Sequence, residues 1–352
     1  MRRRQFLVQC LAASAFGLPA CARPPQRDEV LAALVRGVVV PDAQAVLDAS
    51  DKLHRAVTAF AATPTLPALR VAQAALGAAL LAWKRVECFK NGPLVESNAL
   101  LRATFWPPRP SAIEALLSGA ERIDAQRVEA LGVDVKGLYS LEYLLFPPGL
   151  DDAAALALLS SDPERRRLRL ASELSLSVLG YIQRARQLLG DGSEFAQRFR
   201  LAAKQNLNKL INQMIGSVET LAVNRLDSVL GLSASRLLKP SDIEGAPSHN
   251  SHRLALAELE SVRRLYVEPG SKGLSALVHG LSAPVDARVC SAFDAAARAL
   301  SALPASLELV VVRERPLLAA ALSATKALEL ALKVDLASVL GVTLSFQTGD
   351  GD

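Results

Sequence analysis

The chain has 352 residues, of which 51% are hydrophobic and 21% are charged. This length exceeds what one compact core usually holds, and the apolar fraction excludes a disordered chain, so we expect two folded domains. Aromatic residues make up 5% of the chain, and abundant Ala and Leu favour helices over a β-sandwich or barrel. The net charge is +5, and Arg2, Arg3 and Arg4 supply three of those charges. A nucleic-acid partner therefore lacks electrostatic support.

The first residues have the layout of an export signal. Arg3-Arg4-Gln5-Phe6-Leu7 matches the twin-arginine pattern, and an apolar run follows from Val8 to Leu18. Leu18-Pro19-Ala20-Cys21 resembles a lipobox. We therefore expect residues 1–20 to be a signal peptide and Cys21 to carry a lipid that attaches a periplasmic protein to a bacterial membrane. Plain cleavage and an uncleaved anchor are the alternatives, and each of them also places the folded part outside the cytoplasm.

Two cysteines remain after such processing, Cys88 and Cys290. An oxidising compartment permits a disulfide between them, and two buried free thiols are the alternative. No CxxC motif or Cys/His cluster occurs, so a structural zinc site is not expected.

Apolar residues recur at helical spacing in eight segments, which are residues 28–60, 66–89, 134–146, 163–189, 194–224, 252–266, 284–303 and 316–340. Pro41 is expected to break or kink the first of them. Alternation with a period of two is rare, and residues 306–312 form the only strand-like run.

Proline-rich breaks separate these segments, among them Pro107-Pro108-Arg109-Pro110, Pro147-Pro148-Gly149 and the stretch from Pro240 to Pro247. Gly190-Asp191-Gly192-Ser193 is the best domain boundary. We predict an all-α protein with a tether at residues 21–27 and helical bundles at residues 28–190 and 191–352, each with about four main helices. The similar halves suggest a divergent duplication, although no strong internal repeat is visible.

Glu142 is the strongest candidate for a functional residue. It is the only charged residue in the stretch 138–146, and on a helix it shares a face with Tyr139, Tyr143 and Phe146. A buried carboxylate needs hydrogen bonds, a cation or a metal, or it stays protonated. The sequence leaves three interpretations open, which are a structural bond to Tyr or Arg, a ligand or metal contact, and an exposed position.

Other polar candidates are weaker. Glu87 lies near the end of a long helix and, taken alone, is typical of a surface residue. In Ser248-His249-Asn250-Ser251-His252, Ser251 could cap the next helix. His249 and His252 could share a metal or be exposed loop residues. Asp227 is expected in a helix-end salt bridge, and His54 and His279 are expected to be structural.

Several stretches together resemble the imelysin family of secreted or lipid-anchored bacterial proteins. They are Trp83 with Glu87-Cys88-Phe89-Lys90-Asn91-Gly92-Pro93, Gly137-Leu138-Tyr139-Ser140-Leu141-Glu142, Asn224-Arg225-Leu226-Asp227 with Leu230-Gly231, Ser248-His249-Asn250-Ser251 with Leu265-Tyr266, and residues 332–346 with 349–352. The likeness extends from about residue 30 to the end of the chain, and the order and spacing of the stretches carry it.

The resemblance implies two helical bundles with a site near their junction, in an extracytoplasmic setting linked to iron acquisition. Some members of the family are described as metallopeptidases, and a Gly-x-His-x-x-Glu stretch is held to be the metal or functional site. Here Tyr139 replaces that His, while Gly137 and Glu142 remain. A phenol is a poorer ligand than imidazole for divalent iron or zinc, although it can bind ferric iron.

Three functions follow as alternatives. The first is a non-catalytic binding or accessory lipoprotein linked to iron or another metal, with iron-uptake or other periplasmic partners. The second is a metal-dependent peptidase, and the third is a protein-interaction scaffold with a degenerate site. For the first, the candidate site comprises Glu87, Tyr139, Glu142, Asp227, Ser248 and His249, and a divalent or ferric ion would bind Glu142 and Glu87.

Overall fold

The computed structural model describes residues 23–161, 164–190, 192–231, 239, 242–268, 270–304 and 306–345. The expected signal peptide, the expected lipid attachment at Cys21 and the last residues of the C-terminal resemblance lie outside this part. Every regular element within it is helical, which confirms the all-α prediction.

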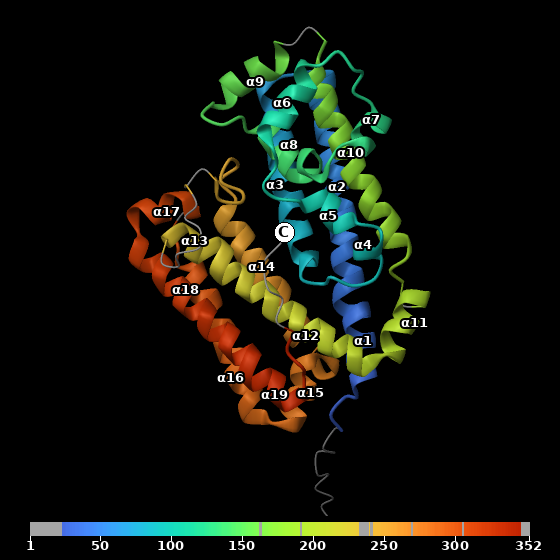
Figure 1. Cartoon of the computed structure of the whole chain (residues 1–352), viewed down its shortest axis with the longest axis vertical. Coiled ribbons are helices and arrows are strands. Elements are labelled where there is room, and N and C mark those ends of the chain that lie inside the picture. Colours follow the sequence, from blue (N-terminus) through green and yellow to red (C-terminus); the bar gives the residue numbers. More distant parts are fainter. Residues whose placement is uncertain are drawn as a thin grey trace, which may run out of the picture.

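The N-terminal half is built around four helices, α2, α3, α8 and α10, which pack against one another in the upper body of Figure 1. Its elements are α1 (Arg27–Leu34), the π-helical η1 (Val35–Val39), α2 (Val40–Ala62), α3 (Leu66–Glu87), α4 (Pro93–Glu96), α5 (Ala99–Thr104), α6 (Pro110–Ser118), α7 (Ala125–Ala130), the short 3₁₀ helix η2 (Val133–Val135), α8 (Gly137–Leu145), α9 (Asp152–Ser160) and α10 (Arg166–Gln187).

The C-terminal half is built around α12, α14, α16 and α18, coloured yellow to red in Figure 1. Its elements are α11 (Glu194–Leu201), α12 (Ala203–Thr220), the π-helical η3 (Leu221–Asp227), α13 (Ser228–Leu230), α14 (Ser251–Val267), η5 (Gly270–Lys272), α15 (Leu274–Leu281), α16 (Ala283–Ser301), α17 (Leu307–Arg313), α18 (Arg315–Leu330), the π-helical η6 (Ala331–Leu336) and α19 (Ala337–Leu340).

The two halves are joined by an extensive contact. Helix α14 packs along α3, and α1 packs against α11 and α12. The buried hydrophobic residues of both halves form one continuous cluster. The division into two domains at residue 190 therefore stays a prediction.

The structure corrects two local expectations. The expected break at Pro41 does not occur, because α1, η1 and α2 form one continuous helix, in which the π-helical η1 ends two residues before the proline. The strand-like run at residues 306–312 is instead helix α17. Its buried residues Leu307, Val310 and Val311 follow a spacing of three and four, which is helical.

A local repeat lies within the C-terminal half. Both α12 and α18 continue into a π-helical segment and then end in Ser-Val-Leu-Gly, at residues 228–231 and 338–341. Both terminal glycines, Gly231 and Gly341, adopt positive φ angles of 66° and 62°. This likeness differs from the expected one, because it relates the ends of two long helices within one half.

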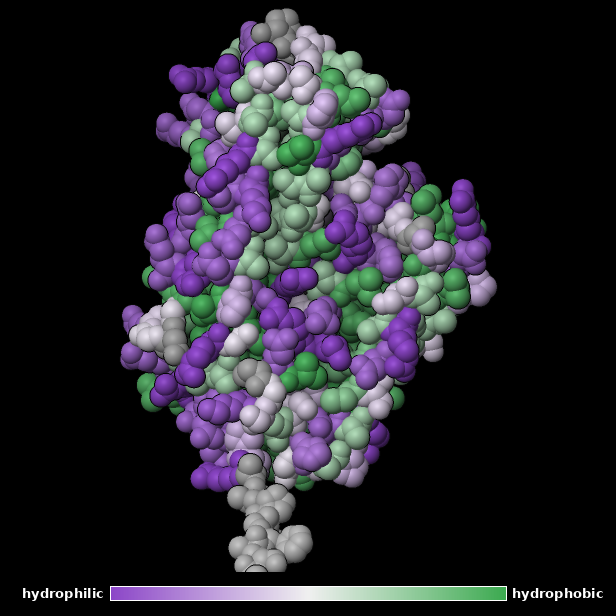
Figure 2. All heavy atoms as spheres, turned by 180° about the vertical axis from the view of Figure 1, so that it is seen from behind, coloured by the Kyte–Doolittle hydropathy of each residue, from purple (hydrophilic) through white to green (hydrophobic). Residues whose placement is uncertain are grey.

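The continuous helix Arg27–Ala62 and helix α3 are long and apolar enough to cross a membrane by composition alone. Both belong to the buried core, with about half of the apolar stretch covered by other helices. Hydrophilic and hydrophobic residues are intermingled over the face shown in Figure 2. Cys88 and Cys290 are both free thiols, and of the two only Cys88 is buried, while Cys290 is half-buried.

Candidate functional site

A pocket of about 1270 Å³ lies where segments of the two halves meet. The N-terminal half contributes parts of α3, α8 and α9 and the loops at residues 106–110 and 146–151. The C-terminal half contributes the loop at residues 242–249 and the start of α17. Three proline-rich breaks that the sequence marks only as helix ends therefore converge on one cavity.

Glu142 is one of the residues that line this pocket. Only 3% of it is exposed, as its apolar neighbours in the sequence predict. Its Oε1 accepts a hydrogen bond from the hydroxyl of Ser248. Burial raises the pKa of Glu142 to about 7, hydrogen bonds from the side chain and backbone of Ser248 oppose this rise, and the charge of Glu308 adds to it. No Lys or Arg in the described part of the chain pairs with it.

Gly137 fixes the start of helix α8, which carries Glu142 into the pocket. Its φ is +77°, and a Cβ atom there would lie 2.5 Å from the carbonyl oxygen of Ala103. A residue with a side chain would be strained and would collide with α5. The glycine of the Gly-x-x-x-x-Glu stretch is therefore needed for packing as well as for backbone conformation.

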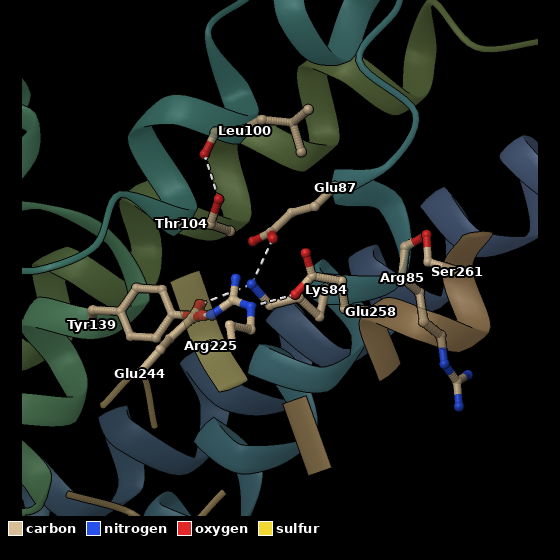
Figure 3. A network of polar contacts seen from close by, with 10 residues as sticks. All are labelled: Lys84, Arg85, Glu87, Leu100, Thr104, Tyr139, Arg225, Glu244, Glu258 and Ser261. Carbon is tan, nitrogen blue, oxygen red and sulfur yellow. Dashed lines mark hydrogen bonds and ion pairs between the residues drawn. The ribbon is translucent and has the colours of Figure 1, made fainter. Parts of the chain in front are cut away.

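A buried polar network lies beside the pocket (Figure 3). At its centre, Glu244 accepts hydrogen bonds at Oε1 from the Tyr139 hydroxyl and from the Lys84 ammonium, whose Nζ lies 2.8 Å away. Lys84 also contacts Oε2 of Glu87 at 2.6 Å. Lys84 is 1% exposed, and burial followed by the charge of Arg225 lowers its pKa.

Arg225 extends this network to a second carboxylate. Its guanidinium pairs with Glu244 and with Glu258 on α14. Burial raises the pKa of the Tyr139 phenol well above its usual range, with a further contribution from Glu87. The phenol therefore stays neutral and acts as a hydrogen-bond donor. Because the network joins α3 and α8 to η3 and α14, it ties the two halves together.

The loop at residues 242–250 connects this network with the pocket. Glu244 enters the network, while Ser248 binds Glu142. Gly245 between them has a φ of +76° and lies close to Ser251 and Leu254 of α14, so a side chain would not fit there. One short loop thus supplies the carboxylate of Glu244 to the network and the hydroxyl of Ser248 to Glu142.

Glu308 is a second buried carboxylate of the pocket. Its Oε1 lies 2.9 Å from Nδ1 of His249, and its Oε2 accepts a hydrogen bond from the Ser251 hydroxyl at 2.5 Å. Ser251 also accepts a bond from the backbone N–H of Leu307. The expectation that Ser251 caps its own helix was therefore wrong, because its hydroxyl serves the start of α17 instead.

The structure brings only some of the candidate residues together. Tyr139, Glu142 and His249 line the pocket, and Ser248 binds Glu142. Glu87 belongs to the network, half-buried against Lys84. Asp227 is buried and pairs with Lys326 of α18 at 3.2 Å, as expected of a helix-end salt bridge.

The remaining histidines make structural contacts. His252 contacts the carbonyl oxygen of Leu300 at 2.8 Å and His54 contacts Ser175 at 3.0 Å, while His279 lies 3.3 Å from Asp286. His252 therefore does not join His249 in a shared site.

Sequence reasoning missed the residues at the centre of the network. Lys84 and Glu258 follow the apolar residues Leu80 and Leu254 by four positions, which places both on the buried faces of their helices. That spacing could have predicted their burial. No such spacing marks Glu244, which lies in a proline-rich loop, or the pocket residue Glu308, which lies in a run that alternates like a strand.

Comparison with known families identifies the chain. A family model described as "Imelysin", of the peptidase M75 group, matches residues 39–336. The chain belongs to the imelysin family. No curated protein matches it in sequence.

Two solved structures of similar fold extend the comparison. A "putative iron-regulated protein A precursor" from Parabacteroides distasonis ATCC 8503 has 19% identity and a TM-score of 0.74, and the match covers 90% of this chain and 96% of that one. An imelysin-like protein from Psychrobacter arcticum 273-4 has 16% identity and a TM-score of 0.73, with coverage of 91% and 97%. At these identities the likeness establishes the fold.

The metal that the imelysin resemblance implies does not fit the residues of this chain. Glu87 and Glu142 share no hydrogen-bond partner, because one binds Lys84 and the other Ser248. The Tyr139 phenol is neutral and donates to Glu244. Across the described residues, no group of three or more His, Cys, Asp or Glu side chains is placed to hold a metal ion. The pocket therefore has a different chemistry from a three-ligand metal centre.

Proposed function

We propose that this imelysin-family protein is an exported, non-catalytic binding protein that holds a small organic ligand in the pocket between its halves. The observation that carries the proposal is Glu142, a buried carboxylate that opens onto a large cavity and has no cation among the described residues. Ligand pockets typically measure about 300–1,000 Å³ and combine apolar walls with a few placed polar groups. This pocket, at about 1270 Å³, is somewhat larger than that range and has the same combination of apolar walls and a few polar groups.

A peptidase is a weaker interpretation. Metal-dependent hydrolysis needs about three protein ligands, an open water position and a general base. The buried carboxylates of the pocket are Glu142 and Glu308, each bound by a serine hydroxyl, and no group of three His, Cys, Asp or Glu side chains among the described residues is placed to hold a metal.

The proposed setting is the periplasm, where a lipid on Cys21 attaches the protein to a membrane and iron uptake is the process it serves. The leader sequence supports export. The link with iron rests on the resemblance and on the solved relative described as iron-regulated. Mass spectrometry of the mature N-terminus tests the anchor. We expect a lipid-modified Cys21, and a Cys21→Ala protein released into the soluble periplasmic fraction would support the same conclusion.

The binding function is tested with a variant that obstructs the pocket. Ala153 is exposed, lies on α9 and lines the cavity, so Ala153→Trp should fill the cavity without disturbing the core. Ala157 is exposed on the same helix but does not line the pocket, which makes Ala157→Trp a matched control.

The measurement is the melting temperature with and without the low-molecular-weight fraction of a periplasmic extract from iron-starved cells. Bound ligand stabilises the folded state by mass action. We expect a rise for the mature wild-type protein and for Ala157→Trp, and none for Ala153→Trp. No rise in the wild type, or an equal rise in all three, would contradict the proposal and favour an interaction scaffold.

A further inference from the structure

The charges that line the pocket are strongly unbalanced. Among the described residues, one guanidinium, Arg70, faces the cavity together with five carboxylates, which are Glu142, Asp151, Asp152, Asp242 and Glu308. Arg70 is already paired with Asp152 at 2.9 Å. Asp151 caps helix α9 and Asp242 has a partner of its own, so the negative charge available to a ligand is chiefly that of Glu142 and Glu308.

Two of these carboxylates are buried without a permanent cation. Glu142 is 3% exposed and, among the described residues, receives hydrogen bonds only from Ser248, while Glu308 is 8% exposed and is bound by Ser251 and His249. They are close enough for the charge of Glu308 to act on Glu142. A buried carboxylate is unfavourable unless a counter-charge is supplied. In this chain, the buried carboxylates of the neighbouring network do have that counter-charge, from Lys84 and Arg225.

Aromatic side chains and prolines also line the pocket. Four aromatic residues line it, which are Trp106, Tyr139, Tyr143 and Phe146, and six prolines from the three converging loops complete it. Aromatic faces attract organic cations, and the face of Trp attracts them most strongly. Proline-rich walls also lose little conformational freedom when a ligand binds.

Buried carboxylates and aromatic rings that line the same cavity match one class of ligand. We infer that the pocket recognises an organic cation, a small molecule with an ammonium or guanidinium group and an apolar body, whose charge lies against Glu142 and Glu308. This inference rests on the proposed binding function and specifies its ligand class. The same surface repels an anionic ligand and gives a neutral one no counter-charge.

The test uses three probes that share a phenyl body and differ in charge, which are 2-phenylethylamine, 2-phenylethanol and 3-phenylpropanoate. Binding to the mature protein is followed by tryptophan fluorescence. The chain has two tryptophans, and Trp106 lines the pocket while Trp83 is buried in the core, so Trp106→Phe reports how much of the signal comes from the pocket. Titrations at pH 8 and low ionic strength keep the amine protonated.

We expect the amine to bind about tenfold more tightly than the alcohol, and the carboxylate to bind most weakly. Glu142→Gln and Glu308→Gln should each weaken amine binding several-fold and leave alcohol binding unchanged. Asp335→Asn, which removes a carboxylate paired with Arg288 outside the pocket, should have no effect.

Equal affinities for the amine and the alcohol, or amine affinity that is unchanged in both Gln variants, would overturn the inference. If the periplasmic fraction still raises the melting temperature through the pocket, the binding function stands and only the ligand class is wrong. If neither the fraction nor any probe acts at the pocket, both proposals fail.

Discussion

The hydroxyl of Ser248 donates a hydrogen bond to the carboxylate of Glu142, a residue 106 positions earlier in the chain. This bond joins a loop of the C-terminal half to helix α8 of the N-terminal half, at the edge of the pocket. The bond partly replaces the water that Glu142 has lost on burial. It leaves the negative charge of the carboxylate without a counter-charge.

The pKa of Glu142 predicts a specific dependence of stability on pH. Its folded-state pKa is about 7, above the ordinary value of 4.5 for a glutamate. The folded state therefore binds more protons than the unfolded state between these values, and stability falls as pH rises through this window. Relative to Glu142→Gln, the free energy of unfolding of the wild type should fall by about 3 kcal/mol between pH 4.5 and pH 8.

Urea denaturation of both proteins across this range measures the difference. Glu308, His249 and Tyr139 face the same region and are present in both proteins, so contributions that the two proteins share cancel in the comparison. Parallel pH profiles would show that Glu142 has an ordinary pKa and is not buried in solution.

The buried network predicts a large effect at Lys84. Lys84→Ala would leave Glu244 with one cation fewer in the interior, so we expect a loss of about 3–5 kcal/mol in the free energy of unfolding. Arg55→Ala, which breaks an exposed pair with Asp51, should cost less than about 1 kcal/mol. Similar losses for the two variants in urea denaturation would mean that the network is solvated.

Restoring the family's histidine gives a third prediction. Tyr139→His removes the hydroxyl that donates to Glu244 but brings no further ligands to Glu142. We therefore expect destabilisation by about 1–3 kcal/mol. We also expect no tight site for ferrous, ferric or zinc ions in isothermal titration calorimetry. A stoichiometric site in the variant would show that one substitution alone separates this chain from a metal-binding member.

Gly137 gives a fourth prediction, because its backbone has a positive φ and the carbonyl oxygen of Ala103 lies where a Cβ would be. Gly137→Ala should lower the free energy of unfolding by more than about 2 kcal/mol. Gly216→Ala is the control, since Gly216 lies within α12 with open space around it. That control should stabilise the protein by up to about 1 kcal/mol. Thermal or urea denaturation compares them, and equal responses would contradict the predicted strain.

Much of the fold could be predicted from periodicity, because the long helices bury continuous apolar stripes. The burial of Glu142 could also be predicted, since its neighbours at three and four positions are apolar. The partners of Glu142 could not, because a contact over 106 residues depends on how the halves pack. The proline breaks were visible in the sequence, but their convergence on one cavity is a property of the tertiary structure.

On the proposed function, Glu142 contacts an organic ligand in the pocket and does not hold a metal ion. Elemental analysis of residues 22–352, purified from a periplasm without a metal-affinity tag and compared with Glu142→Ala, tests it most directly. Our account predicts that neither protein contains iron or zinc in stoichiometric amounts. Near-stoichiometric metal in the wild type that is lost in Glu142→Ala would contradict the account.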